Sequence, residues 1–365
     1  MKIIRIETIP YKIPYLTPLE FATGSITEVE NVLVRIHTDE GIIGCAEAPS
    51  RPYIYGESQA SIIYAIQSWF WPSLTNIDLR NIERVYHAMR WVTGNQTARA
   101  AIDMAIWDAL GQLYQRPCYQ LLGGWDNKIA VSHMIGYDQP QKMVEHALMM
   151  KDKYGVTTFK VKTGRNVHAD ITACKALRKA MPEACLYLDS NHGWPAHDAI
   201  YAAQSLRDEN FLFFEEPSPA SDRIGRKKLA NVLAQPICGD ESCKSLNDVA
   251  QEINDGMVSF ICIKTARTGF TESAKIAALC EGLQVPVYVG NQGDTQLGTL
   301  ANIQFACARK NTCQHAAELT NFLEIADDLS AVPLVIKEGF AEASTAPGTG
   351  IMVDEDKLTY YRCDK

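Results

Sequence analysis

The apolar residues of this chain follow two different periods, and the change between them divides its N-terminal part. Up to about residue 50 the apolar positions alternate as in strands, for example from Ile3 to Ile9 and from Asn31 to Ile36. Between Ala98 and Leu113 they recur with the spacing of one buried helix face. Gly123-Gly124 then interrupts the pattern. The periods predict an α+β domain over residues 1–124.

Residues 125–328 alternate between strand-like apolar runs and helical stretches. We count eight such runs, the first near Ile129 to Ile135 and the eighth from about Cys313 to Glu318. Repeating βα units with right-handed crossovers favour a closed parallel barrel, and a doubly wound open sheet is the main alternative. Residues 329–365 form a C-terminal tail, in which we expect a further strand within 350–361 that packs back on the first domain.

Charged residues end five consecutive apolar runs of the predicted barrel. From Lys162 to Lys264 they are spaced 24 to 27 residues apart, about the length of one strand and its return helix. The set comprises Lys160, Lys162, Asp189, Glu215, Asp240 and Lys264. In a barrel these side chains would meet at the C-terminal mouth, where such folds carry out chemistry.

The three carboxylates predict a site for a divalent metal ion. Asp189, Glu215 and Asp240 would repel one another strongly unless a cation neutralised them. Mg²⁺ prefers oxygen ligands, with Mn²⁺ as a substitute, and keeps positions open for water or substrate. Glu216 and Glu241 compete for the ligand role, but neighbouring strand side chains point to opposite faces, and the regular spacing favours Glu215 and Asp240.

The three lysines predict proton transfer. Lys160 and Lys162 are two residues apart, so both project into the barrel mouth, and Lys264 faces them from the sixth strand. We expect burial beside a metal to push lysines toward neutrality, so that they can act as bases. The α-carbon of a metal-bound carboxylate would then lie between the two lysine stations.

These motifs resemble the enolase superfamily, and more narrowly its muconate lactonizing enzyme subgroup. The resemblance rests on these segments: Lys160-Val161-Lys162, Asp189-Ser190-Asn191, Glu215-Glu216-Pro217, Gly239-Asp240-Glu241-Ser242, Lys264 to Gly269, Ala98 to Asp103 and Leu122-Gly123-Gly124. It implies a modified (β/α) TIM-type barrel under an α+β capping domain formed by the N-terminal region and the C-terminal tail. The mandelate-racemase-like branch would carry a histidine at the end of the seventh strand, paired with an aspartate on the sixth. Here those strands end at Asn291 and Lys264, so this branch is disfavoured.

Substrate selection should lie in loops over the barrel mouth. We expect contacts from Arg51, Tyr53 and Tyr55, from the loop Phe21 to Ile26, and from Asn291, Gln292 and Glu318. Arg51 could bind a distal carboxylate bidentately or be a surface arginine, and the two tyrosines could close over the substrate or anchor their loop. Glu318 resembles a substrate-side glutamate of the subgroup, with a structural partner role as the alternative.

Composition and charge narrow the class of partner. The net charge of −8 and the lack of a Lys/Arg block argue against nucleic acid and anionic membranes as partners. No signal peptide or membrane span is expected, and the irregularly spaced cysteines are typical of a reduced, cytoplasmic protein. The resemblance implies a small-molecule carboxylate substrate and a homo-oligomer, a dimer or an octamer.

The leading functional hypothesis is a Mg²⁺-dependent muconate cycloisomerase. It would convert cis,cis-muconate to muconolactone through an enolate, with Lys162 as proton donor, Lys160 tuning Lys162, and Lys264 acting by charge or proton transfer. The runner-up is a racemase or epimerase of N-acyl amino acids or dipeptides that uses Lys162 and Lys264 on opposite faces. A related dehydratase or an o-succinylbenzoate synthase is weaker, and the complete set of charges argues against a non-catalytic protein on the same fold.

Overall fold

An antiparallel three-stranded sheet begins the chain. The computed structural model describes residues 1–21 and 24–364. The strands β1 (Ile3–Phe21), β2 (Gly24–Thr38) and β3 (Ile43–Pro49) pair in sequence order, with Ile9 opposite Leu33 and Val34 opposite Ala46. Because side chains alternate along a strand, Val34 faces the main core while Leu33 faces a second, smaller core on the other side.

Helices cover one face of this sheet and complete the capping domain. The longest, α5 (Gln96–Tyr114), confirms the helix predicted from the apolar stripe and is buried along most of its length. The others are α1 (Pro52–Tyr55), α2 (Gln59–Ala65), the π-helix η1 (Ile66–Phe70), α3 (Trp71–Leu74), α4 (Ile82–Ala88) and α6 (Cys118–Leu122). Ser58 caps α2 by accepting a hydrogen bond from the Ser61 amide.

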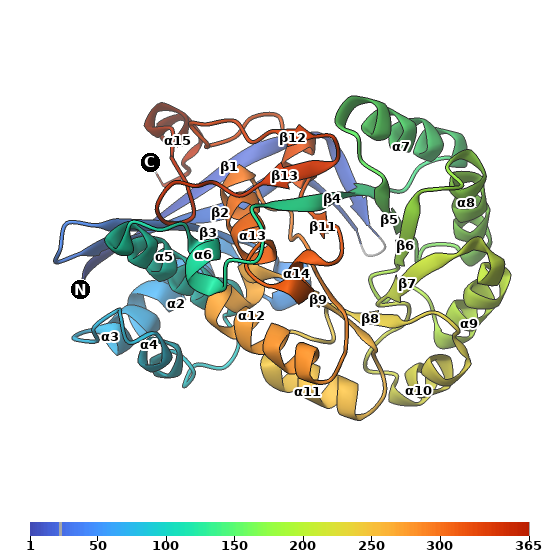
Figure 1. Cartoon of the computed structure of the whole chain (residues 1–365), viewed down its shortest axis with the longest axis horizontal. Coiled ribbons are helices and arrows are strands. Elements are labelled where there is room, and N and C mark those ends of the chain that lie inside the picture. Colours follow the sequence, from blue (N-terminus) through green and yellow to red (C-terminus); the bar gives the residue numbers. More distant parts are fainter. Residues whose placement is uncertain (22–23, 365) are drawn as a thin grey trace.

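Eight parallel strands form the barrel, with helices on its outside (Figure 1). The strands are β4 (Lys128–Ile135), β5 (Thr158–Lys162), β6 (Cys185–Asp189), β7 (Phe211–Glu215), β8 (Ile237–Gly239), β9 (Phe260–Ile263), β10 (Val287–Val289) and β11 (Ala317–Glu318). The outer helices are α7 (Pro140–Tyr154), α8 (Val167–Ala180), α9 (Ala196–Ser205), η2 (Arg207–Glu209), α10 (Arg223–Val232), α11 (Leu246–Asn254), α12 (Thr265–Gly282), α13 (Gln296–Ala306), α14 (Lys310–Cys313) and η3 (Asn321–Glu324).

The strand order confirms the barrel and excludes the open sheet. Strands β4 to β10 are neighbours in sequence order, and β11 returns to pair with β4 at Ala317 and Val131. A doubly wound sheet would instead reverse its strand order at a switch point. Aromatic rings, among them Tyr187, Phe213 and Tyr288, fill the barrel interior below the mouth.

No helix among the described residues is long and apolar enough to cross a membrane.

The C-terminal tail is divided between the two domains. Strands β12 (Ile336–Lys337) and β13 (Phe340–Glu342) form a hairpin that pairs antiparallel with the start of β4. Helix α15 (Glu355–Tyr361) then packs Leu358 into the smaller core against β1 and β2. The strand expected within 350–361 was wrong, because Asp354 caps a helix there by accepting from the amides of Asp356 and Lys357.

A buried aspartate joins the capping domain to the barrel. Asp103 of α5 accepts hydrogen bonds from the amides of Phe270 and Thr271 at 2.6 and 2.9 Å and from the Thr271 hydroxyl at 2.5 Å. The chain kinks at Gly269, whose φ of 63° lies in the left-handed region. A Cβ there would lie 2.5 Å from Asp103 Oδ2, so the close approach of the two elements requires glycine.

We therefore expect Asp103→Ala to lower the free energy of unfolding by about 3 kcal/mol, because two buried amides would lose their acceptor. Denaturant titration followed by circular dichroism measures the change. Asp152→Ala on the exposed face of α7 is the control and should shift stability by less than about 0.5 kcal/mol. An unchanged midpoint for Asp103→Ala would contradict this account of the domain junction.

Candidate active site

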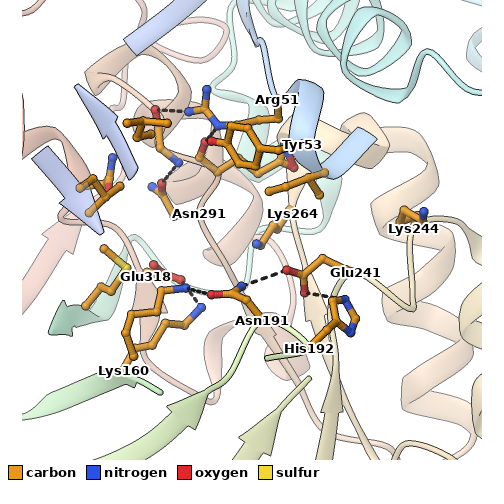
Figure 2. Close-up of a pocket in the computed structure, with 18 of the residues that line it drawn as sticks. Arg51, Tyr53, Lys160, Asn191, His192, Glu241, Lys244, Lys264, Asn291 and Glu318 are labelled. Carbon is orange, nitrogen blue, oxygen red and sulfur yellow. Dashed lines mark hydrogen bonds and ion pairs between the residues drawn. The ribbon is translucent and has the colours of Figure 1, made fainter. Parts of the chain in front are cut away.

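A cavity of about 380 Å³ opens at the C-terminal ends of the barrel strands. Barrel residues form its floor, and Arg51 and Tyr53 of the capping domain lie above them in Figure 2. Leu19 and Ile26 of the capping domain also line the cavity. All three predicted lysines line it. The cavity therefore lies where the sequence predicted the chemistry, between the barrel mouth and the cap.

The three predicted metal ligands lie at the ends of adjacent strands. Asp189 and Glu215 are register partners at the ends of β6 and β7, and Asp240 directly follows β8. Each is at most 1% exposed. Burial, followed by the charge of Asp189, raises the pKa of Glu215 well above its usual value. The three carboxylates thus crowd negative charge, as expected of residues that share a cation.

Glu216, which competes with Glu215 for the predicted ligand role, is engaged by protein partners. It has a φ of 37° and accepts from Nη1 of the buried Arg226 at 2.8 Å. Its other oxygen accepts from the amides of Asp240 and Ser242 at 2.7 and 2.8 Å. These partners commit Glu216 to holding the strand ends together. Glu241, the other competitor, accepts from Asn191 at 2.9 Å and lines the cavity.

The predicted lysines bind the predicted carboxylates directly. Lys160 Nζ lies 3.2 Å from Asp189 and 3.1 Å from Glu215. Lys162 Nζ lies 2.6 Å from Asp189 and donates to Asn191 at 2.7 Å. From the opposite side, Lys264 Nζ donates to Asp240 at 2.5 Å. The lysine stations face each other across the floor of the cavity, as the strand positions predicted.

Ion pairs hold Lys160 and Lys264 in the charged form, contrary to the neutrality expected of them. Burial by itself lowers the pKa of Lys160, but the neighbouring carboxylates, Glu215 first, outweigh it and hold the pKa well above its usual value. Asp240 does the same to Lys264. Direct ion pairs with carboxylates therefore outweigh the effect of burial on the pKa of both lysines.

Arg51 and Tyr55 fasten the cap loop to the loop after β10. Arg51 is only 3% exposed, which excludes a surface arginine. Its guanidinium donates to the carbonyls of Gln292 at 2.6 Å, Ser50 at 2.6 Å and Gly293 at 3.0 Å. The Tyr55 hydroxyl donates to Gln292 Oε1 at 3.0 Å. Tyr53 lines the cavity and is 45% exposed, so of the two tyrosines Tyr55 anchors and Tyr53 faces the substrate space.

Asn291, Gln292 and Glu318 all line the cavity, and Ile26 lines it from the predicted loop Phe21 to Ile26. Asn291 accepts from the amides of Gly293 and Asp294, which fixes its amide orientation and leaves Nδ2 buried with no hydrogen-bond partner in the described structure. Gln292 Nε2 is likewise buried and unpartnered there. Glu318 lies 2.8 Å from Lys160 Nζ. Of the predicted loop Phe21 to Ile26, Ala22 and Thr23 lie outside the described residues.

Sequence reasoning missed three residues that support the site. Tyr288 donates to Glu215 at 2.6 Å, and Arg267 donates to Asp240 at 2.7 Å. Asn191 joins Lys162 to Glu241. Period-two alternation along β10 could have placed Tyr288 inside the barrel. No sequence signal pairs Arg267 with Asp240, because the contact depends on how α12 begins.

Fold and site together define a (β/α)-barrel protein with buried lysines and carboxylates at the C-terminal ends of its strands. Two family models agree with this class: "Enolase C-terminal domain-like" matches residues 142–357, and "Mandelate racemase / muconate lactonizing enzyme, N-terminal domain" matches residues 4–123. The chain belongs to the enolase superfamily, and its relatives identify it as an isomerase.

Three similar proteins illustrate the range of activities around this chain. The muconate lactonizing enzyme from Mycobacterium smegmatis, solved with muconolactone, is 45% identical over 100% of both chains with a TM-score of 0.98. The hydrophobic dipeptide epimerase from Enterococcus faecalis is 33% identical over 96% of this chain and 99% of its own. A dipeptide epimerase structure from the same species, with Mg and L-Leu-L-Tyr, is 31% identical over 96% and 99%, with a TM-score of 0.90.

We expect Arg226→Met to destabilise the protein by about 3–5 kcal/mol, because it leaves the buried Glu216 carboxylate without its cation. Adding Glu216→Leu should recover part of the loss by removing the stranded charge. Thermal and denaturant unfolding measure both, with Arg84→Met at an exposed position as the control. Equal stability of Arg226→Met and Arg84→Met would contradict a structural role for the pair.

Proposed function

We propose that this chain is a muconate cycloisomerase, which closes cis,cis-muconate to muconolactone. The observation that carries the proposal is the likeness to the Mycobacterium smegmatis enzyme over the full length of both chains. The charges and donors of the cavity supply independent support.

The cavity wall suits an anion with a carboxylate at each end. Its described lining includes five basic side chains, Arg51, Lys160, Lys162, Lys244 and Lys264, and three glutamates, Glu20, Glu241 and Glu318. Every one of these glutamates already has a partner: Arg165 for Glu20, Asn191 for Glu241 and Lys160 for Glu318. Oε2 of Glu241 accepts no hydrogen bond from the described residues and could receive the ammonium group of a dipeptide. The five basic groups nevertheless outnumber the three glutamates, so a dicarboxylate meets net positive charge.

The two unpartnered amides offer donors for the distal carboxylate. Buried donors without acceptors cost about 1–3 kcal/mol each, so Asn291 Nδ2 and Gln292 Nε2 gain when a substrate oxygen reaches them. We assign them this role. Arg51 holds the loop that carries them, and its contacts to the Gln292 and Gly293 carbonyls set their position.

Asp189, Glu215 and Asp240 fit a magnesium ion, because they are three buried oxygen donors at the ends of adjacent strands. When bound, the ion would supply positive charge beside the substrate carboxylate on which negative charge develops. Lys160, 1% exposed and between Asp189 and Glu215, would hold the same carboxylate from below.

In this reaction the protein has to position the substrate and to donate one proton. An oxygen of the distal carboxylate forms a C–O bond to the double bond, and the displaced electron pair moves toward the other carboxylate. Lys162 donates a proton from Nζ to the α-carbon and recovers it from water, while Asn191 and Asp189 hold its ammonium group in place. Lys264 contributes positive charge from the opposite face. The roles of all these residues are predictions.

A dipeptide epimerase is the second candidate, favoured by the 33% identity to the Enterococcus faecalis epimerase over nearly the whole of both chains. The geometry for it is present, since Lys162 and Lys264 approach the cavity floor from opposite sides. Removal and return of an α-proton would use both lysines.

A homo-oligomeric state and a cytoplasmic location stay predictions.

Loss of one predicted ligand should remove magnesium binding. We expect Glu215→Gln to weaken Mg²⁺ binding in calorimetric titration by more than about tenfold, because a neutral amide is a poor ligand for this ion. Glu216→Gln, its neighbour, should be less stable yet bind Mg²⁺ with nearly unchanged affinity. Loss of binding in folded Glu216→Gln alone would mean that the register of ligands is wrong.

Turnover in deuterated water distinguishes the two functions. With Mg²⁺ and cis,cis-muconate we expect loss of the muconate ultraviolet band and one deuterium in the lactone. A dipeptide panel in parallel should show no α-hydrogen exchange. Exchange and inversion of a dipeptide with muconate untouched would overturn the proposal.

Lys162→Ala should lower the rate of muconate turnover by at least about 100-fold, since a general acid contributes a factor of about 10²–10⁴ to the rate. The exposed-lysine control Lys175→Ala should not change it.

A further inference from the structure

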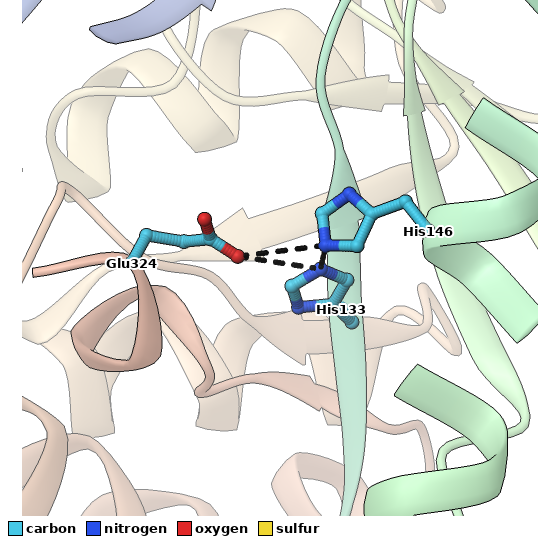
Figure 3. Close-up of side chains that lie close together, drawn as sticks. All are labelled: His133, His146 and Glu324. Atoms are coloured by element: carbon cyan, nitrogen blue, oxygen red, sulfur yellow. Dashed lines mark hydrogen bonds and ion pairs between the residues drawn. The ribbon is translucent and has the colours of Figure 1, made fainter. Parts of the chain in front are cut away.

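A second group of metal-ligating side chains lies outside the active-site cavity. His133 comes from β4, His146 from α7 and Glu324 from η3, and Figure 3 shows the three converging on one point. We call them the histidine cluster. Along β4 the side chain of Met134 lines the cavity, so that of His133 faces the opposite way, toward α7. None of the three residues lines the cavity.

The distances within the histidine cluster match those between ligands of one metal ion. His133 Nε2 lies 3.1 Å from His146 Nε2 and 3.8 Å from Glu324 Oε1, and His146 Nε2 lies 3.6 Å from the same oxygen. Tetrahedral zinc with bonds of about 2.0–2.1 Å places its ligand atoms about 3.3 Å apart. The observed triangle therefore needs shifts of only a few tenths of an ångström to close on an ion.

The surroundings of His133 prepare it as a ligand. Its Nδ1 lies 2.8 Å from the Thr320 hydroxyl, and that hydroxyl donates to the Ser132 carbonyl, so Nδ1–H is the donor in the first contact. Nε2 then carries the lone pair that points at the cluster. A second bond that orients a ligating imidazole is typical of protein zinc sites.

Access from solvent is open on the other side of the cluster. The side chains of His146 and Glu324 are 31% and 26% exposed, which leaves room for a water molecule as the fourth ligand. A rival group, His192 with Glu216 and Glu241, is also close together. It is the weaker candidate, because Glu216 is already held by Arg226 and Ser242.

We propose that His133, His146 and Glu324 bind a divalent transition-metal ion, zinc in particular, at a site separate from the carboxylates of the active site. Two imidazoles and one carboxylate prefer such an ion over Mg²⁺, which takes oxygen ligands. The ion would tie η3 to β4 and α7. Because Glu318 and Asn321 at the start of this segment line the cavity, its role would be to hold one wall of the active site. The proposal does not depend on the proposed function.

Zinc stoichiometry tests this site. The purified full-length chain is dialysed against micromolar free Zn²⁺ with excess Mg²⁺ to occupy the carboxylate site, and bound metal is measured by mass spectrometry. We expect His146→Ala and Glu324→Gln each to bind one zinc fewer than the wild type. His87→Ala is the matched control: His87 also lies 3.6 Å from a glutamate, Glu83, on an exposed helix, but has no second histidine. It should bind as the wild type does.

Two further measurements keep the outcome decisive. Saturating zinc should raise the melting temperature of the wild type and of His87→Ala, but not of His146→Ala or Glu324→Gln. Co²⁺ should give the visible absorption of a nitrogen-liganded site that disappears in His146→Ala. Both test positions are partly exposed, so circular dichroism should show intact folds. Equal zinc content in wild type and folded His146→Ala, or no zinc bound by either, would overturn the proposal.

Discussion

The mutual neutralisation of buried lysines and carboxylates at the strand ends is the constraint on which the active site depends. Lys160, Lys162 and Lys264 and their acidic partners are nearly inaccessible to water. Burying one such charge alone costs several kcal/mol, so each must find an opposite charge or a metal ion at short range. The barrel brings the opposite charges this close, because its parallel strands place residues some 25 positions apart in the sequence at neighbouring points on one rim.

Two other buried carboxylates hold the capping domain on the barrel. Asp103 binds the kinked start of α12, and Glu47 of β3 accepts from the amides of Thr295 and Gly298 at the start of α13 at 3.0 and 3.1 Å. A carboxylate at a helix N-terminus is stabilised by the unpaired amides there. These joints fix the cap over the mouth, and Arg51 then places the loop of Asn291 and Gln292 above the lysines.

This division of labour explains why one fold supports several isomerisations. In the proposed mechanism the floor of the cavity stabilises negative charge on a carboxylate and offers a proton from either side, which lactonisation and epimerisation both require. In the proposed function, substrate selection lies in the upper wall, where two buried amide groups have no acceptor among the described residues. Changes confined to that wall would alter the substrate without disturbing the ion pairs beneath.

The sequence by itself determined the barrel and the strand-end charges, because a βα unit has a nearly constant length and leaves its period in the chain. It left Glu216 as a competitor of Glu215, since the contact that engages Glu216 comes from Arg226, ten residues away, and leaves no mark on the strand spacing. Only the tertiary structure showed that Arg51 is buried and binds backbone carbonyls of the loop after β10, and that the lysines form ion pairs with carboxylates. His133, His146 and Glu324 follow no period at all, because three separate elements bring them together in space.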